Sequence, residues 1–333
     1  MNTKINEFEV MAPVGSRESL AAAIQAGADS VYFGIGKLNM RSHSANHFTI
    51  DDLREIAATC NEHGIKTYLT VNTVIYDDDI ETMKEIIDAA KEAGISAVIA
   101  SDVAVMSYCN EVGEEVHLST QLNISNTEAL KFYARFADVS VLARELNMDQ
   151  VKHIHEQIEK QNICGPMGKQ IRIEMFCHGA LCMAVSGKCY MSLANANRSA
   201  NRGECVQICR RSYTVTDNET GNQLEIDNKY VMSPKDLKTI RFIDRMMDAG
   251  VRVFKIEGRA RELSLDEIRE IHKKNPSTQL EVFVHGALCV SYSGVSHLVA
   301  RTVVLILRIS EIATSRHAIA VSSIELALPE VRR

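Results

Sequence analysis

The sequence predicts an α/β fold, a (β/α)8 barrel of the TIM type, and three observations support this prediction. Residues 8–160 alternate short apolar or β-branched runs with stretches whose apolar residues recur at helical spacing. Several of the helical stretches end at a glycine, which favours a helix C-terminus. The alternation supplies six strands in residues 8–160, and Gln170–Phe176 and Val251–Ile256 bring the number to eight, which closes such a barrel. A doubly wound open sheet is the alternative, because the same alternation also produces that fold.

Each predicted strand is followed by a segment that returns the chain to the start of the next strand, as parallel pairing requires. The last predicted helix has Ser233 as its N-cap and Pro234 at its first position, and both residues favour a helix start. The predicted strands are Phe8–Ala12, Ser30–Phe33, Lys66–Val71, Ala97–Ala100, Val116–Ser119, Val139–Leu142, Gln170–Phe176 and Val251–Ile256. The predicted helices are Ser16–Ala26, Asp51–His63, Asp79–Ala93, Val103–Val112, Asn126–Phe136, Asn147–Lys160 and Ser233–Ala249.

The alternation stops at residues 177–232, which are rich in Ser, Asn, Gly and Cys. This composition predicts a Cys-rich loop insertion after strand 7, ordered by something other than a hydrophobic core. The predicted barrel, including this insertion, spans residues 8–260. Residues 261–294 are predicted to be an aberrant C-terminal partial repeat of residues 144–187, and residues 295–333 a tail of unknown structure.

Composition narrows the class of protein. Of the 333 residues, 46% are hydrophobic and 24% charged, which suits a globular protein with a full core. A net charge of −6 argues against a protein that coats nucleic acid non-specifically, although RNA remains open as a substrate. The N-terminus has no apolar signal region, and no run of 18 apolar residues occurs. We therefore expect a cytoplasmic protein that does not span a membrane.

Five of the nine cysteines fall within residues 177–209, and four of these, Cys182, Cys189, Cys205 and Cys209, are the predicted metal ligands. A set of four thiolates suits either a [4Fe–4S] cluster or Zn²⁺. Zinc sites usually contain paired cysteines with two to four residues between them, and only Cys205 and Cys209 have such a spacing. The irregular spacing therefore favours the cluster, with zinc or buried structural thiols as alternatives. The remaining cysteines are interpreted as structural.

The run from Glu174 to Ser192 resembles the signature of the peptidase U32 family. The resemblance implies two kinds of activity: collagenase-like peptidase activity, or oxygen-independent hydroxylation of RNA by members that hold a [4Fe–4S] cluster. Those members act on tRNA uridine with prephenate or on ribosomal RNA cytidine, and the tRNA-directed branch looks closest. Carried over by position, the four cysteines match the cluster ligands of the RNA-hydroxylating members. Further likeness lies at residues 9–15, 27–34, 117–121, 144–146 and 255–259.

Active sites of such barrels lie at the C-terminal ends of the strands. Arginine and lysine there would suit a dicarboxylate such as prephenate, or an RNA phosphate. The sequence has no G-x-S-x-G or H-E-x-x-H motif, so we favour the hydroxylase over the peptidase. Surface ion pairs and helix caps remain the alternative for each residue. The predicted catalytic residues are Arg144, Glu145, Glu174, His178, Lys255, Glu257 and Arg259. Weaker candidates at strand ends are Asn72, Thr73, Ser101, Asp102, Thr120 and Gln121.

A second copy of part of the barrel begins after the predicted eighth strand. Residues 260–272 repeat residues 143–155, and residues 281–289 repeat residues 174–182. No cysteine follows Cys289, so this copy lacks the remaining cluster ligands. A third interpretation is therefore an inactive truncated or fused family member.

Overall fold

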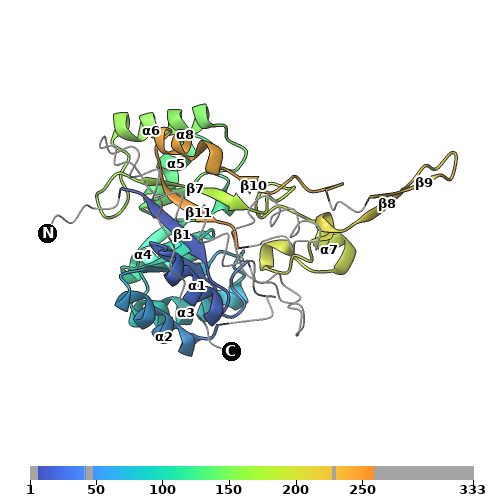
Figure 1. The fold of residues 1–333 in the computed structure, drawn as a ribbon. Helices are drawn as coiled ribbons and strands as arrows, with labels where there is room; N and C mark the ends of the chain where they lie inside the picture. Colours follow the sequence, from blue (N-terminus) through green and yellow to red (C-terminus); the bar gives the residue numbers. More distant parts are fainter. Residues whose placement is uncertain (1–6, 41, 43–47, 227–229, 259–333) are drawn as a thin grey trace, which may run out of the picture.

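The computed structural model describes residues 7–258 except 41, 43–47 and 227–229. Within this part of the chain, eight parallel strands form a closed barrel in the order β1-β2-β3-β4-β5-β6-β7-β11 (Figure 1). The barrel closes because β11 pairs with β1 and β7 pairs with β6. The predicted (β/α)8 architecture is confirmed, and the open sheet is excluded. Arg259, the partial repeat and the tail lie outside the described residues.

The boundaries of the elements follow the predicted alternation closely in the first six strand–helix units. The strands are β1 (Glu9–Pro13), β2 (Ser30–Phe33), β3 (Lys66–Val71), β4 (Ala97–Ala100), β5 (Val116–Leu118), β6 (Val139–Val141), β7 (Arg172–Gly179), β8 (Tyr213–Thr216), β9 (Gln223–Ile226), β10 (Leu237–Lys238) and β11 (Val251–Ile256). The α-helices are α1 (Arg17–Ala26), α2 (Ile50–Glu62), α3 (Ile80–Ala93), α4 (Val103–Val112), α5 (Thr127–Ala134), α6 (Met148–Gln161), α7 (Met191–Ala196) and α8 (Ile243–Asp248).

Local side chains fix where the helices begin and end. The side chains of Ser16, Asn126 and Asn147 each accept a hydrogen bond from a backbone N–H in the first turn of α1, α5 and α6. Gly94 ends α3 with φ of 74°, a left-handed conformation that glycine adopts without a side-chain clash. These caps explain why the helix ends could be read from the sequence.

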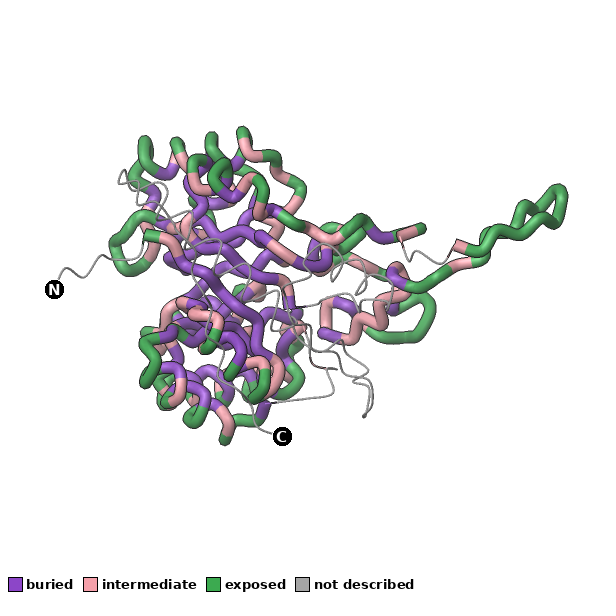
Figure 2. Tube along the Cα trace, in the orientation of Figure 1, coloured by how far each residue is buried: buried purple, intermediate pink, exposed green. Residues whose placement is uncertain are grey.

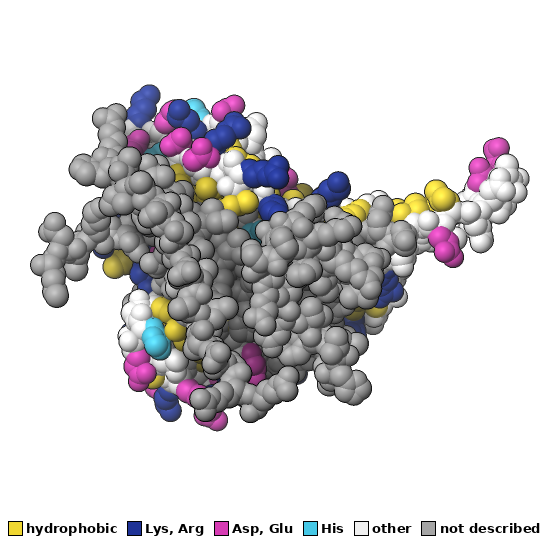
Figure 3. Space-filling view, in the orientation of Figure 1, with side chains coloured by type: hydrophobic (Ala, Val, Ile, Leu, Met, Phe, Trp, Pro, Cys, Tyr) yellow, Lys and Arg dark blue, Asp and Glu magenta, His cyan; other side chains and the backbone are white. Residues whose placement is uncertain are grey.

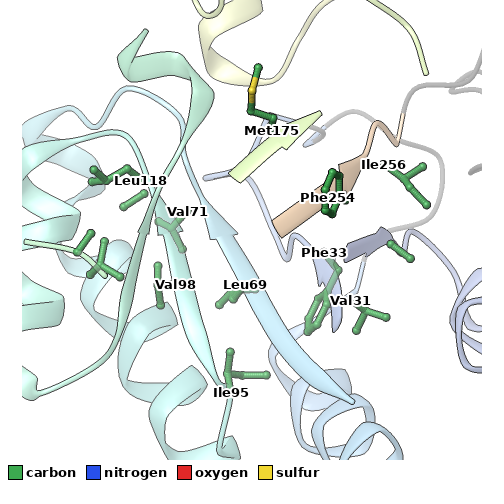
Figure 4. Packing of buried hydrophobic residues seen from close by; sticks show 14 of the residues in the cluster. Val31, Phe33, Leu69, Val71, Ile95, Val98, Leu118, Met175, Phe254 and Ile256 are labelled. Carbon is green, nitrogen blue, oxygen red and sulfur yellow. The ribbon is translucent and has the colours of Figure 1, made fainter. Parts of the chain in front are cut away.

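The hydrophobic core has two parts, because alternate strand residues face opposite sides of the barrel wall. Outward residues such as Leu69, Val98 and Phe254 pack against the helices, as Figure 4 shows for part of this cluster. A smaller buried cluster, which includes Met11 and Tyr68, fills the barrel interior. The barrel strands are accordingly buried along almost their whole length (Figure 2).

A charged network occupies the interior at the N-terminal ends of the strands. The Glu9 carboxylate accepts hydrogen bonds from Tyr68 Oη at 2.6 Å, Lys66 Nζ at 3.0 Å and Arg172 Nη1 at 3.1 Å. Burial alone would raise the pKa of Glu9, but Lys66, Tyr68 and Arg172 together lower it to about 2. Glu9 is therefore ionised in the folded protein, and the network connects three strands at the end of the barrel opposite the predicted site.

The predicted helix Ser233–Ala249 is wrong over its first ten residues, since the helix α8 begins only at Ile243. The preceding residues pair with β7 instead: Leu237 and Lys238 form β10, antiparallel to β7. The Thr239 hydroxyl also donates to the Cys177 carbonyl at 2.8 Å. Because β7 offers backbone partners beyond its predicted end, sheet pairing overrides the helix-start signal of Ser233 and Pro234.

The insertion after β7 contains elements that the sequence did not predict, namely α7 and the β8–β9 hairpin. The hairpin extends away from the barrel, and nearly all of its residues are exposed (Figures 1 and 2). Its far end carries acidic side chains (Figure 3). Within the residues that the structure describes, no helix is long and apolar enough to cross a bilayer.

Candidate functional site

A buried ion pair lies inside the barrel between two neighbouring strands, β7 and β11. Lys255 Nζ is 2.7 Å from Glu174 Oε1, and the two side chains are 6% and 0% exposed. The Lys255 ammonium also lies 4.5 Å from the centroid of the Tyr32 ring. The second oxygen of Glu174, Oε2, is buried and has no hydrogen-bond partner among the described residues. This oxygen is thus a free acceptor, which in native proteins usually receives a hydrogen bond from water or a ligand.

A second ion pair lies next to the first and connects the barrel to the Cys-rich insertion. Arg144, which follows β6, has Nη1 3.7 Å from Glu257 Oε2, and each of these side chains is 16% exposed. Its Nη2 donates to Ser186 Oγ at 2.9 Å, and its guanidinium lies 5.1 Å from the centroid of the Phe176 ring. Lys255 Nζ lies 5.8 Å from the same ring. Phe176 therefore contacts the cations of both ion pairs.

His178 lies at the end of β7, beside the second ion pair, and its carbonyl accepts a hydrogen bond from the Glu257 N–H at 2.8 Å. Burial lowers the pKa of His178, and the positive charge of Lys238 lowers it further, while Asp236 opposes the shift. The imidazole is therefore neutral at pH 7 and can accept a proton.

Four of the seven predicted catalytic residues, Arg144, Glu174, Lys255 and Glu257, thus form two adjacent ion pairs, with His178 beside them. Glu145 does not join them. Its side chain is exposed, and no ion pair of Glu145 occurs within the described part of the chain. Arg259 lies outside the described residues, so its predicted role stays a prediction.

The four cysteines of the predicted ligand set lie on the insertion. Cys182 is exposed, and Cys189, Cys205 and Cys209 are partly exposed. Burial raises the pKa of Cys209, the charge of Arg210 lowers it, and the charges of the other three cysteines raise it further. Such charge effects require proximity, so each of the other three thiols lies near Cys209. The insertion therefore gathers sulfur atoms that are distant in the sequence.

Three other cysteines are chemically different. Cys60, Cys109 and Cys177 are buried, and burial raises the pKa of each thiol, to about 11, 12 and 12 respectively. These thiols are protonated at neutral pH, which agrees with a structural role. Cys164 is partly exposed and lies outside the insertion.

The arrangement of the four thiols bears on which metal group they fit. Among the residues that the structure describes, no three His, Cys, Asp or Glu side chains lie close enough together to hold one metal ion. A structural zinc ion needs four donors at about 2.0–2.3 Å from one point. In a [4Fe–4S] cluster each cysteine binds a different iron, so the sulfur atoms stand farther apart. Both groups require the thiols to lie near one another, so the nearness of Cys182, Cys189 and Cys205 to Cys209 leaves the [4Fe–4S] cluster and zinc as candidates.

Two further contacts attach the insertion to the strand ends. The Ser186 carbonyl accepts a hydrogen bond from Asn123 Nδ2 at 3.0 Å, near the end of β5. Arg202 donates to both carboxylate oxygens of Asp79, at 2.6 and 3.1 Å, and to the Val74 carbonyl at 2.6 Å. The hydrogen bond with Arg202 is the main cause that lowers the pKa of Asp79. These contacts hold the insertion beside the two ion pairs.

Several weaker candidates have structural roles. Asp102 caps α4 by accepting from the Ala104 N–H at 2.9 Å, and it also accepts from the Ile75 N–H at 3.0 Å. The Ser101 hydroxyl donates to the Asn72 carbonyl at 2.8 Å. For Asp102 and Ser101, the capping and loop-ordering interpretation is the better one.

Sequence reasoning missed three residues of the site: Tyr32, Phe176 and Ser186. Tyr32 and Phe176 belong to apolar strand segments, where an aromatic residue signals a core position as readily as a binding site. Ser186 stands between Cys182 and Cys189, and that position in the signature was the available signal.

Comparison with known proteins adds a family assignment. The model of peptidase family U32 matches residues 15–260 and 259–302. A collagenase of Porphyromonas gingivalis is 72% identical over 257 residues, which are 77% of this chain and 62% of the collagenase. The 23S rRNA 5-hydroxycytidine C2501 synthase of Escherichia coli is 35% identical, over 79% of this chain and 38% of the synthase. The tRNA hydroxylation protein P1 of Bacillus subtilis is 34% identical, over 77% of this chain and 59% of that protein.

The chain therefore spans about three fifths or less of the length of these relatives. A solved structure of a U32 peptidase superposes with a TM-score of 0.50 at 11% identity, covering 79% of this chain and 97% of that one. This likeness supports the barrel fold alone.

Proposed function

Because this chain belongs to peptidase family U32, we propose that it is an iron–sulfur enzyme that hydroxylates RNA without molecular oxygen. One observation supports this proposal most directly. Ser186, which stands between Cys182 and Cys189, accepts a hydrogen bond from Arg144. The cysteine-bearing insertion and the two ion pairs are therefore parts of one site, in which a redox group would lie next to the residues that hold a substrate.

Cys182, Cys189, Cys205 and Cys209 would hold the cluster. The proximity of the other three thiols to Cys209, the exposure or partial exposure of all four, and the positive charge of Arg210 support this assignment. A bound cluster would supply one-electron transfer or an open iron position for substrate. Zinc is the alternative metal for the same thiols.

The ion pairs would bind and orient the substrates. The Arg144–Glu257 contact of 3.7 Å is long for an ion pair, so Arg144 Nη1 would be available to a substrate carboxylate or phosphate while Nη2 keeps its hydrogen bond to Ser186. Prephenate, the co-substrate that the resemblance implies, presents such carboxylates. Glu174 Oε2 would accept a hydrogen bond from a substrate N–H or O–H group, and neutral His178 would take up a proton.

The RNA is proposed to be tRNA rather than ribosomal RNA. Sequence identity does not separate these choices, because the two RNA-directed relatives are 34% and 35% identical. The preference rests on the run from Cys205 to Arg210, which resembles the tRNA-directed branch. Uridine in tRNA is therefore the first substrate to test.

A collagenase-like peptidase is the second candidate, and the relative that is 72% identical and named a collagenase favours it. A peptidase needs an activated nucleophile or a metal-bound water. The adjacent Cys177 and His178 do not supply such a pair, because Cys177 is buried with its pKa raised to about 12 and successive strand residues face opposite sides. The geometry thus gives the peptidase less support than the hydroxylase.

The metal group is tested by anaerobic purification of the whole chain. We expect a brown protein with about four irons and four sulfides per chain. Cys182→Ser should lose the iron, and the matched control Cys164→Ser, outside the insertion, should keep it. A colourless protein with one tightly bound zinc per chain would contradict the cluster.

The reaction is tested by nucleoside mass spectrometry of tRNA and ribosomal RNA from a deletion strain that expresses the wild type or Cys182→Ser. We expect the wild type alone to restore a hydroxylated uridine in tRNA. Restoration of a hydroxylated nucleoside in ribosomal RNA instead would make ribosomal RNA the substrate. If a cluster-loaded chain restores hydroxylation in neither RNA, the result would support the interpretation as an inactive family member. Gelatin cleavage that survives replacement of Cys182 and Cys189 would favour the peptidase.

A further inference from the structure

Arg210 is a charged side chain that the proposed reaction does not use and that the fold nevertheless buries, with 8% exposure. It follows Cys209 directly and ends the short 3-10 helix Ile208–Arg210. Its Nη2 donates to the Leu181 carbonyl at 2.7 Å, and its Nη1 lies 3.3 Å from Asp236 Oδ1. Burial of an arginine is unfavourable unless an anion offsets its charge and acceptors bind its N–H donors. Here Asp236 offsets the charge, and the Leu181 carbonyl and Asp236 accept hydrogen bonds.

These contacts connect segments that are far apart in the sequence. Leu181 precedes Cys182, so its carbonyl belongs to the peptide group that leads into the first cysteine of the set. Asp236 precedes β10, which pairs with β7. One guanidinium therefore joins the segment of the first cysteine, the segment of the last cysteine and the barrel wall.

We propose that Arg210 is a positioning residue that holds Cys182 beside Cys209 and places a permanent positive charge next to the cluster. This inference rests on the proposed function, because it assigns Arg210 to the same metal group. A guanidinium is suited to the task, since its planar set of N–H donors reaches a carbonyl and a carboxylate at the same time. A lysine at this position keeps the charge but presents a single ammonium group on a flexible chain.

The neighbouring residue provides a matched control. Arg211 has the same charge and follows Arg210 directly, but its side chain is exposed. Arg211→Gln therefore removes one positive charge near the insertion without removing the contacts to Leu181 and Asp236. Arg210→Gln removes both the charge and the contacts. Arg210→Lys keeps the charge but removes the simultaneous contact with Leu181 and Asp236.

The first measurement does not need the cluster. The whole metal-free chain is oxidised with diamide, and the Cys182–Cys209 disulfide is quantified by mass spectrometry relative to the Cys205–Cys209 disulfide, which forms within one segment. We expect Arg210→Gln to lower this ratio about tenfold, because two hydrogen bonds of a charged group no longer hold the segments together. Arg210→Lys should also lower the ratio, and Arg211→Gln should leave it unchanged.

The second measurement uses the anaerobic, iron-loaded protein. We expect iron to leave Arg210→Gln at least several times faster than the wild type on exposure to a chelator, and the midpoint potential to fall, because a nearby positive charge favours the reduced cluster. Arg210→Lys should keep a potential close to that of the wild type. Circular dichroism identifies any variant that fails to fold. Asp236→Asn then serves in place of Arg210→Gln in the disulfide measurement alone, because it weakens the Asp236 contact but keeps the charge of Arg210.

The outcomes separate this inference from the function on which it rests. If Arg210→Gln and Arg211→Gln give the same disulfide ratio and the same rate of iron loss, the positioning role is overturned. If the wild type holds no iron, the proposed function is overturned, and with it the role of Arg210 beside a cluster. A lowered disulfide ratio would then show only that Arg210 joins the two segments.

Discussion

Replacement of Lys255 by methionine removes a buried positive charge while keeping an unbranched side chain of similar length. The partner Glu174 is 0% exposed, so its carboxylate would stay in the barrel without a cation. Loss of one member of a buried ion pair costs about 3–5 kcal/mol. In a domain of this size each kcal/mol lowers the melting temperature by about 2–4 °C. We therefore expect Lys255→Met to lower the melting temperature by roughly 6–20 °C.

The assay is thermal unfolding followed by circular dichroism, with urea unfolding at 25 °C as a second measure of the unfolding free energy. Lys84→Met is the matched control, because Lys84 forms an exposed ion pair with Glu81 at 3.2 Å, and such pairs contribute little. The double variant Lys255→Met/Glu174→Gln should recover much of the lost stability, since no unpaired charge remains. A Lys255→Met protein as stable as the Lys84→Met protein would refute the reasoning.

Three further predictions concern other parts of the fold. Because the pKa of Glu9 is lowered from 4.5 to about 2, its stabilisation is complete above pH 4.5 and is lost as the pH falls toward 2. In urea titrations, Glu9→Gln should therefore remove roughly 3 kcal/mol of the fall in unfolding free energy that the wild type shows between pH 4.5 and pH 2. An unfolding free energy that depends on pH as in the wild type would contradict this. Gly179→Ala should destabilise the protein by about 1–3 kcal/mol and displace Glu257, because Gly179 has φ of 111° and an added Cβ would lie 2.7 Å from Glu257 Cβ. Urea unfolding measures the cost, and a neutral substitution would argue against the backbone constraint. Arg202→Gln should make the insertion susceptible to protease at temperatures where the barrel stays folded, because its paired contact with Asp79 is lost. Cleavage at the wild-type rate would show that other contacts hold the insertion.

Much of the barrel could be predicted from the sequence, because short apolar runs mark its strands and apolar residues at a spacing of about 3.6 residues mark its helices. The strands Ser30–Phe33, Lys66–Val71 and Val251–Ile256 lie at their predicted positions, since β-branched and apolar residues fill them and turn residues bound them. The predicted helix at Ser233 failed for a physical reason. Its cap signals are local, whereas the pairing of Leu237 with Gly179 is a long-range contact that no local pattern reveals.

The candidate site was predictable in its parts and not in its connections. The cysteine spacing indicated a metal group, and the position at strand ends indicated Arg144 and Glu257. The partly buried hydrogen bond between Arg144 and Ser186 depends on how the insertion folds back over the barrel, which residue spacing does not encode. Glu145 is exposed and lies apart from the two ion pairs, because a position next to Arg144 in the sequence does not place its side chain beside Glu257 in space.

The pairing of β7 constrains the order of events during synthesis of the chain. β7 carries Glu174 and His178 and leads into Cys182, but its partner β11 is made about 80 residues later, carries Lys255 and leads into Glu257. Until the ribosome has released residues through Ile256, β7 lacks a neighbour on one side and the Glu174 carboxylate has no counter-ion. The buried ion pair between Glu174 and Lys255 therefore forms only after almost the whole described part of the chain has been synthesised.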